Sequence, residues 1–167
     1  MLDDLTNLQA LLKDSTLLAT RGYIAGEWCD GENGKTFPVF NPARGDVITD
    51  VADISRTQTA EAISIAEKAQ KLWAARPAKE RSNLLRNWYN LMMENQEDLA
   101  TILTAEQGKP IEEAKGEIAY GASFIEFFAE EAKRVYGETL PGHQSDKRIT
   151  VLKQPVGVAA AITPWNF

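Results

Sequence analysis

The chain has 167 residues, of which 44% are hydrophobic and 25% are charged, as is ordinary for a globular protein of one domain. Its formal net charge is −6 and no basic block occurs, which argues against nucleic acid as a partner. A single cysteine, Cys29, excludes an internal disulfide and suits a reducing compartment. The N-terminus has no secretory-signal pattern and no apolar run is long enough to span a membrane, so we expect a cytoplasmic protein without a membrane partner.

The N-terminal third combines one ambiguous segment with a set of short strands. Residues 1–20 carry leucines at helical spacing, and either a short helix or a frayed tail fits them. Between residues 22 and 53 the extended runs 23–25, 37–40 and 47–51 are separated by turn residues. This pattern predicts small antiparallel strands at the edge of a domain.

Four helices are predicted next. The first begins at Ser55, where Gln58 three residues later completes a capping box, and the second begins near Ala78. The third ends at Gly108. The fourth has Pro110 in its first turn and is expected to run as one helix over 110–136, to Gly137. Its apolar seam is Ile111, Ala114, Ile118, Gly121, Ile125, Phe128 and Ala132.

A glycine inside this seam and the last thirty residues complete the prediction. A glycine inside a helix lowers the stability of the helix relative to alanine. Because Gly121 lies in the middle of the seam, we expect that it allows another backbone to approach closely. A strand is predicted near 147–154. The uncharged run 156–162 is typical of a strand buried on both faces of a parallel sheet.

Few residues point to chemistry by themselves. His143 is the only histidine and lies in a predicted turn, so an exposed residue is favoured over a catalytic triad. Cys29 has no second cysteine and no nearby base, which favours a structural role. Acidic pairs on the helices are typical of a solvated face, although a hydrolase with paired carboxylates stays open. No pattern predicts a metal site.

The C-terminal segment offers the one candidate site. Asn166 follows the apolar run within Pro164-Trp165-Asn166-Phe167, and ligands bind beyond the carboxyl ends of strands in open α/β sheets. A side-chain amide at that edge can donate a hydrogen bond to a developing oxyanion. A strand followed by an ordinary turn is the alternative.

Several motifs, taken in order, resemble the aldehyde dehydrogenase superfamily over nearly all of residues 21–167. They are Gly26-Glu27-Trp28, Asn41-Pro42-Ala43, Glu106-Gln107-Gly108-Lys109-Pro110, Gln154-Pro155-Val156-Gly157-Val158 and Ile162-Thr163-Pro164-Trp165-Asn166-Phe167. The resemblance implies an α/β fold, the N-terminal part of the aldehyde dehydrogenase fold. It combines an incomplete Rossmann-like cofactor domain with the first oligomerisation strand.

The same resemblance divides the chain into three parts. Residues 1–136 correspond to the N-terminal part of the cofactor-binding domain, with edge strands and then four helices. Residues 137–155 correspond to a segment of the oligomerisation arm. Residues 156–167 correspond to the first strand of the Rossmann-like sheet and the start of the nicotinamide site.

Two stretches, 86–93 and 141–148, resemble bacterial NADP-preferring succinate-semialdehyde dehydrogenases and their relatives that oxidise glutarate semialdehyde. The family implies NADP or NAD as cofactor, a small aldehyde as substrate and a homo-oligomer. A cysteine thiolate attacks the aldehyde, hydride passes to the nicotinamide, and a glutamate activates water to release the acid.

The resemblance also implies roles for the residues of the last motif. Asn166 matches the amide that helps to hold the oxyanion, and Phe167 matches an aromatic at the substrate tunnel. The cofactor contacts match Ile162, Thr163, Pro164, Trp165 and Asn166.

The resemblance stops before the family's catalytic cysteine and glutamate, and Cys29 does not match the nucleophile. We therefore expect an N-terminal fragment of such an enzyme that is inactive alone. The alternative is a non-catalytic remnant that acts as an interaction module with intact subunits.

Overall fold

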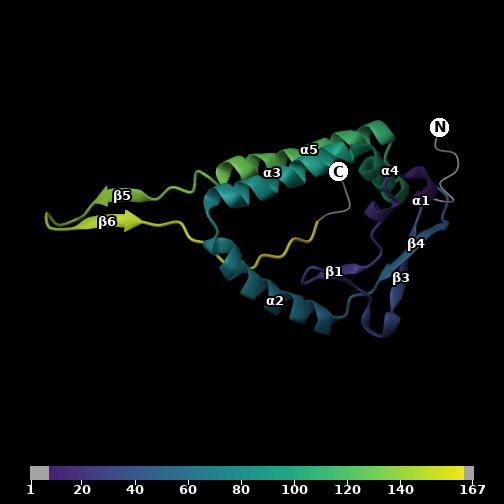
Figure 1. Cartoon of the computed structure of the whole chain (residues 1–167), viewed down its shortest axis with the longest axis horizontal. Coiled ribbons are helices and arrows are strands. Elements are labelled where there is room, and N and C mark those ends of the chain that lie inside the picture. Colours follow the sequence, from purple (N-terminus) through teal and green to yellow (C-terminus); the bar gives the residue numbers. More distant parts are fainter. Residues whose placement is uncertain (1–7, 164–167) are drawn as a thin grey trace.

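The computed structural model describes residues 8–163, and Figure 1 shows a mixed α/β arrangement from which one ribbon protrudes. In chain order its elements are α1 (Leu8–Leu11), η2 (Ser15–Leu17), β1 (Gly22–Ile24), β2 (Glu27–Cys29), η3 (Glu32–Gly34), β3 (Thr36–Phe40), β4 (Val47–Ala52), α2 (Arg56–Ala75), α3 (Ala78–Glu94), α4 (Gln96–Gln107), α5 (Ile111–Glu131), β5 (Glu138–Pro141) and β6 (Arg148–Val151).

The predicted N-terminal strands are present and antiparallel. The runs 37–40 and 47–51 form the sheet β3–β4, and the run 23–25 overlaps β1, which pairs with β2, a strand that was not predicted. Residues Ala25 and Gly26 both have positive φ between β1 and β2, which is the backbone of a tight hairpin turn and explains the glycine. The β3–β4 register shifts between Val39 and Phe40. A short helix, α1, lies within the first twenty residues, and the part of that prediction that concerns residues 1–7 lies outside the described residues.

The structure confirms the predicted starts of the first two long helices and the predicted end of the third. The Ser55 side chain caps α2 by accepting a hydrogen bond from the Gln58 backbone N–H. The Ser55 backbone N–H in turn donates to the Gln58 side-chain oxygen at 3.0 Å, which completes the capping box. Helix α3 begins at Ala78. Helix α4 ends at Gly108, whose φ of 80° lies in the left-handed region that glycine adopts without strain.

Helix α5 is one long helix, as predicted, but it ends at Glu131 rather than near Gly137. It packs against both α3 and α4. The small residues Ala114, Ala122 and Ala129 are buried in this contact, whereas Phe128 of the predicted seam is exposed. Small side chains at a helix contact let the two backbones approach closely.

The hypothesis about Gly121 is wrong. No atom lies within 4 Å of the position that a Cβ at Gly121 would occupy, and the residue is exposed. The true stripe is displaced by one residue to Ala122. A heptad count drifts relative to the 3.6-residue turn of a straight helix, which accounts for the error.

The predicted strand near 147–154 is β6, and it pairs with β5, which was not predicted. The ribbon is antiparallel, with Leu140 opposite Ile149 and Glu138 opposite Val151. All its residues are exposed, and it projects away from the helices at the left of Figure 1.

The prediction of a strand over 156–162 is wrong for this structure. The described residues 152–163 have no regular secondary structure. Val156 is fully exposed and Ile162 is 98% exposed. A strand exists only where a neighbouring strand accepts its backbone hydrogen bonds, and none of the three described sheets contains one for this segment.

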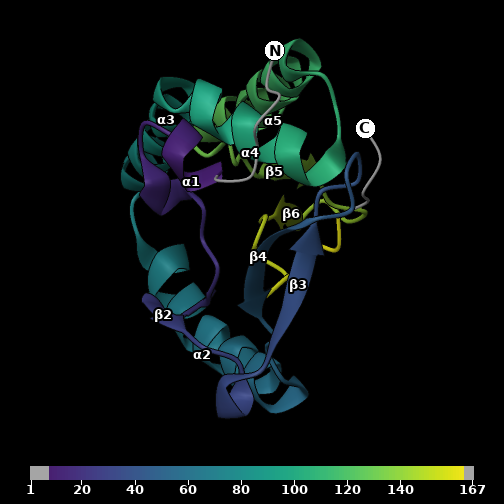
Figure 2. The same cartoon turned by 90° about the vertical axis from the view of Figure 1, so that its right-hand side faces the viewer.

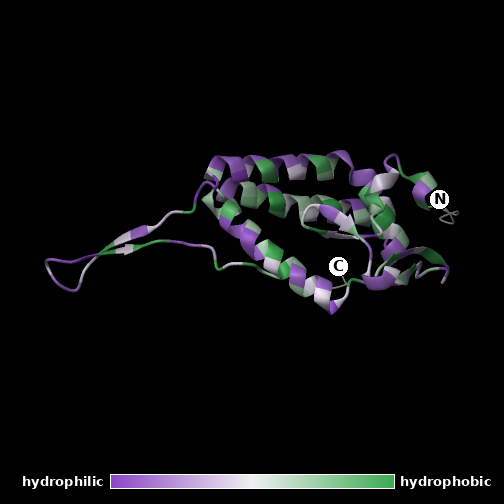
Figure 3. Ribbon diagram, turned by 60° about the horizontal axis from the view of Figure 1, so that its bottom comes forward, coloured by the Kyte–Doolittle hydropathy of each residue, from purple (hydrophilic) through white to green (hydrophobic). Residues whose placement is uncertain are grey.

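The core is small and made mainly of small side chains. Leu8, Leu12 and Ala105 form a buried cluster, with Leu18, Ile48 and Ile102 packed around it. Figure 2 views the molecule along its length, from the end where α1 lies beside α4. Many large apolar side chains remain exposed on the helices, and Figure 3 shows apolar and polar residues interspersed along them. The burial achieved is therefore modest for the amount of apolar surface present.

Candidate functional site

The segment that carries the predicted site approaches the body of the molecule after the β5–β6 ribbon. It runs back from β6 past the corner between α2 and α3 (Figure 1). The backbone groups of 156–163 make no hydrogen bond to the described part of the chain. Gly157 has a φ of 120°, which places it outside strand geometry.

The structure describes only two of the predicted site residues. Ile162 and Thr163 are both exposed. The oxyanion donor Asn166, the cofactor contacts Pro164 and Trp165 and the substrate contact Phe167 lie outside the described residues. Their predicted roles thus stay predictions.

Two of the motifs meet in space although they are distant in sequence. Asn41 is buried, and its side-chain oxygen accepts a hydrogen bond from the Ala43 backbone at 2.9 Å, which holds the turn closed. A Cβ at Gly108 would stand 3.2 Å from Pro42, so the loop after β3 lies against the end of α4. Lys109 in the same turn forms an ion pair with Glu117 of α5. These motifs therefore build a scaffold rather than a reactive cluster.

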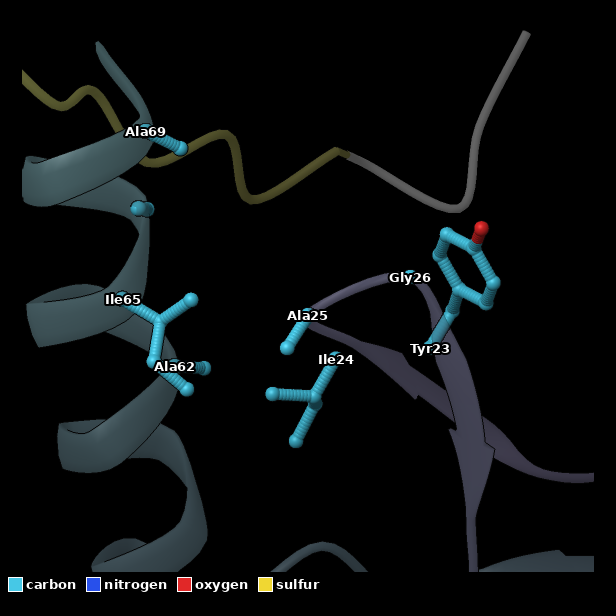
Figure 4. Close-up of a pocket in the computed structure, with 8 residues that line it drawn as sticks. Tyr23, Ile24, Ala25, Gly26, Ala62, Ile65 and Ala69 are labelled. Carbon is cyan, nitrogen blue, oxygen red and sulfur yellow. The ribbon is translucent and has the colours of Figure 1, made fainter. Parts of the chain in front are cut away.

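The third motif lines an apolar hollow. Tyr23 and Trp28 pack against each other across the β1–β2 hairpin, with ring centroids 4.9 Å apart and ring planes tilted by 58°. Figure 4 shows the hairpin turn facing α2, and the hollow between them has a volume of about 510 Å³. Its lining is Tyr23, Ile24, Ala25, Gly26, Ala62, Ile65, Ala66 and Ala69. No lining residue is charged, and the Tyr23 hydroxyl is the one polar side-chain group of the lining, so the hollow offers no cluster of reactive groups.

The alternative catalytic sites are not assembled. Within residues 8–163, His143 has no hydrogen-bond partner that would make it part of a triad. Cys29 is a half-buried free thiol in β2. No group of three or more potential metal ligands occurs among the described residues.

The acidic pairs on α5 hold helices together instead of forming a hydrolase site. Glu126 and Glu130 both accept hydrogen bonds from Arg86 of α3, at 2.5 and 2.9 Å. The two carboxylates raise the pKa of the Arg86 guanidinium, and Lys133 and Arg86 together lower the pKa of Glu130. Sequence reasoning missed this link because Arg86 lies forty or more residues from its partners.

No helix in the described part of the chain is long and apolar enough to cross a membrane.

Comparison with known proteins shows which proteins this chain is similar to. The model of the aldehyde dehydrogenase family matches residues 28–167. The chain is 61% identical to glutarate-semialdehyde dehydrogenase of Pseudomonas putida, over 93% of this chain and 32% of that protein. It is 58% identical to the NADP(+) succinate-semialdehyde dehydrogenase GabD of Escherichia coli K12, with the same two coverages.

The structure agrees with these sequence similarities. It superposes on succinate-semialdehyde dehydrogenase from Burkholderia pseudomallei with a TM-score of 0.90 and 54% identity, covering 93% of this chain and 32% of that one. The chain spans about a third of the length of the relatives that it matches. Because the family match extends over most of the chain, the chain belongs to the aldehyde dehydrogenase family.

Proposed function

We propose that this chain is the N-terminal part of an NAD(P)-dependent dehydrogenase that oxidises succinate semialdehyde or glutarate semialdehyde to the dicarboxylic acid. The observation that carries the proposal is the 58–61% identity to enzymes named for these two substrates. Relatives at that level include both substrates, so either fits the chain. A cytoplasmic location belongs to the same proposal.

The residues present are compatible with a nicotinamide cofactor. Ile162 and Thr163 are exposed, and the backbone of residues 156–163 makes no hydrogen bond to the described residues 8–163, so its N–H and C=O groups can face a ligand. We propose that Ile162, Thr163, Pro164, Trp165 and Asn166 contact NADP or NAD, and that Phe167 borders the aldehyde. When bound, the cofactor would accept the hydride.

Asn166 would serve as a preorganised donor. Its side-chain amide would donate a hydrogen bond to the oxyanion that develops on the aldehyde oxygen, and such a donor acts without reorganisation at the moment of reaction. The single cysteine among residues 1–167 is Cys29, which does not match the family's nucleophile. We therefore propose that residues 1–167 alone show no semialdehyde oxidation with either cofactor.

The experiment is a chimera in which this chain replaces the matching segment of the Escherichia coli enzyme named above. We expect the chimera to oxidise succinate or glutarate semialdehyde with NADP or NAD. Asn166→Ala in the chimera should lower kcat about 10²–10³-fold, the usual effect of removing one oxyanion donor. A chimera with the parent enzyme's assembly state but no activity on either substrate would refute the proposed function.

We also propose that the β5–β6 ribbon joins subunits of a homo-oligomer. The support is geometric: the ribbon is exposed along its whole length and stands clear of the helices (Figure 1). Unpaired strand edges are templates for another strand. The same feature favours the second candidate function, an interaction module that pairs with intact subunits.

A further inference from the structure

A second hollow lies at the corner between α2 and α3, apart from the segment assigned to the cofactor. Its volume is about 370 Å³, and its lining comes from four places in the chain. These are Ala74 at the end of α2, Arg81 in the first turns of α3, Val135 after α5, and Lys153, Gln154 and Pro155 after β6. Figure 1 shows the chain returning from β6 to this corner.

Two cations share the hollow, and no carboxylate lines it. The Nε atom of Arg81 is buried and has no hydrogen-bond partner. Neither Arg81 nor Lys153 forms an ion pair in the part of the chain that the structure describes, although most other described arginines do. This happens in a protein whose net charge is −6.

The nearby carboxylates are already engaged. Glu80, beside Arg81 in sequence, pairs with Arg76 at 3.9 Å. Glu131 lines the adjoining hollow, which shares Val135 and Lys153, but it accepts a hydrogen bond from the Arg134 Nε at 2.9 Å. Arg81 and Lys153 are thus left to a group from elsewhere.

A buried guanidinium N–H without an acceptor costs free energy, and two like charges in one hollow repel each other. Arg81 also lies near the N-terminal, positive end of α3, where a cation is unfavourable. All three costs are relieved by an anion with several acceptor oxygens. The planar guanidinium fork suits phosphate and carboxylate, and the Lys153 ammonium adds a second charge.

We infer that the Arg81–Lys153 hollow is a binding site for an oxyanion, either a small phosphate or carboxylate or the carboxylate side chain of a second copy of this chain. The inference goes beyond the proposed function and does not depend on it. Gln154 supplies an amide that can donate a further hydrogen bond.

The test is equilibrium dialysis of the chimera described above, which contains this chain, against radiolabelled phosphate and, separately, succinate, at constant ionic strength. Dialysis reports binding whether or not the chain self-associates. We expect saturable binding of one anion per chain. Arg81→Gln and Lys153→Gln should each weaken it about tenfold or more, because each removes a charge-assisted hydrogen bond. Lys79→Gln is the matched control: Lys79 is an exposed cation of α3 that does not line the hollow, so affinity should not change.

Sedimentation velocity, with and without phosphate, distinguishes the two sources of the anion. Binding without a change in size assigns the site to a small anion. Phosphate-driven dissociation that Lys153→Gln abolishes assigns it to a carboxylate of a second copy. Lys153 is exposed, so this variant decides the outcome even where Arg81→Gln lowers helical content by circular dichroism. Absence of both effects, or equal affinity in Lys153→Gln, would overturn the inference.

Discussion

At the scale of single residues, Asp98 ties the start of the described chain to α4. Its side chain is buried and accepts hydrogen bonds from the backbones of Lys13 and Asp14, at 3.1 and 2.8 Å. These partners lie more than eighty residues away. The contact therefore closes the small core that contains Leu8, Leu12 and Ala105.

We expect Asp98→Ala to lower the free energy of unfolding by about 1–3 kcal/mol, because it leaves two backbone N–H groups without their acceptor. Asp98→Asn should cost less, since one acceptor oxygen remains. Urea unfolding of the chimera, monitored by circular dichroism, measures the change in unfolding free energy for both variants. Asp50→Ala is the control, because Asp50 is an exposed aspartate outside this contact. An Asp98→Ala variant as stable as that control would show that the contact contributes nothing.

At the scale of elements, α5 is the central helix because it contacts α3 and α4 together. Its buried face is formed by Ala114, Ala122 and Ala129, each with no exposed surface. Its remaining surface carries exposed aromatic residues, such as Phe127 and Phe128 with ring centroids 5.2 Å apart. Packing thus depends on small side chains, and aromatic bulk lies outside.

Ala122→Leu and Gly121→Ala make a matched pair of adjacent changes on α5. We expect Ala122→Leu to destabilise the chain by about 1–3 kcal/mol, because extra methylenes do not fit a closed helix contact. Gly121→Ala should stabilise it by about 0.5–1 kcal/mol, since the new methyl group meets no atom and alanine favours the helix. Thermal unfolding of the chimera carrying either change compares the two variants. The reverse order of stability would restore the idea that Gly121 is the contact residue.

The ribbon of β5 and β6 supports a separate prediction about assembly. Ile149 and Leu140 are cross-strand neighbours with 43% and 42% exposure. Ile149→Asp in the chimera should weaken subunit association, since a carboxylate would have to be buried at the joint. Light scattering after size-exclusion chromatography measures the mass. Gln144→Asp, at the exposed tip of the ribbon, should leave the mass unchanged; equal masses for both variants would place the subunit contact elsewhere.

At the scale of the whole molecule, exposed apolar surface dominates the behaviour of residues 1–167 alone. Val156 and Ile162 are almost entirely exposed, and the hollow between the β1–β2 hairpin and α2 is open and apolar. Each such side chain forgoes about 1.5–3 kcal/mol of burial. Net stabilities are only about 5–15 kcal/mol, so a few such losses matter.

We therefore expect the isolated chain to be aggregated or partly molten and to bind a hydrophobic dye. Size-exclusion chromatography with thermal unfolding at neutral pH is the measurement. The uncharged, proline-free run 156–162 has the composition that favours pairing between chains. A monomer or dimer with one sharp cooperative transition would instead support the interaction module.

Features that depend on neighbouring residues could be predicted from the amino-acid sequence. Ser55 with Gln58 located the start of α2, Gly108 located the end of α4, and the ordered motifs indicated the family. Caps, glycine φ angles and helical periods act over about four residues, so they can be read along the chain.

Features that depend on partners distant in the sequence could not be predicted, because they require the folded path of the chain. The run 156–162 has the composition of a strand but no neighbouring strand in the described structure. In contrast, β5 was not predicted, and it forms a strand because it pairs with β6. Arg86 binds two glutamates of α5, and Arg81 and Lys153 line one hollow, over separations that no local pattern encodes. Strand pairing and charge clusters are relations between segments, and the chain's path through space establishes them.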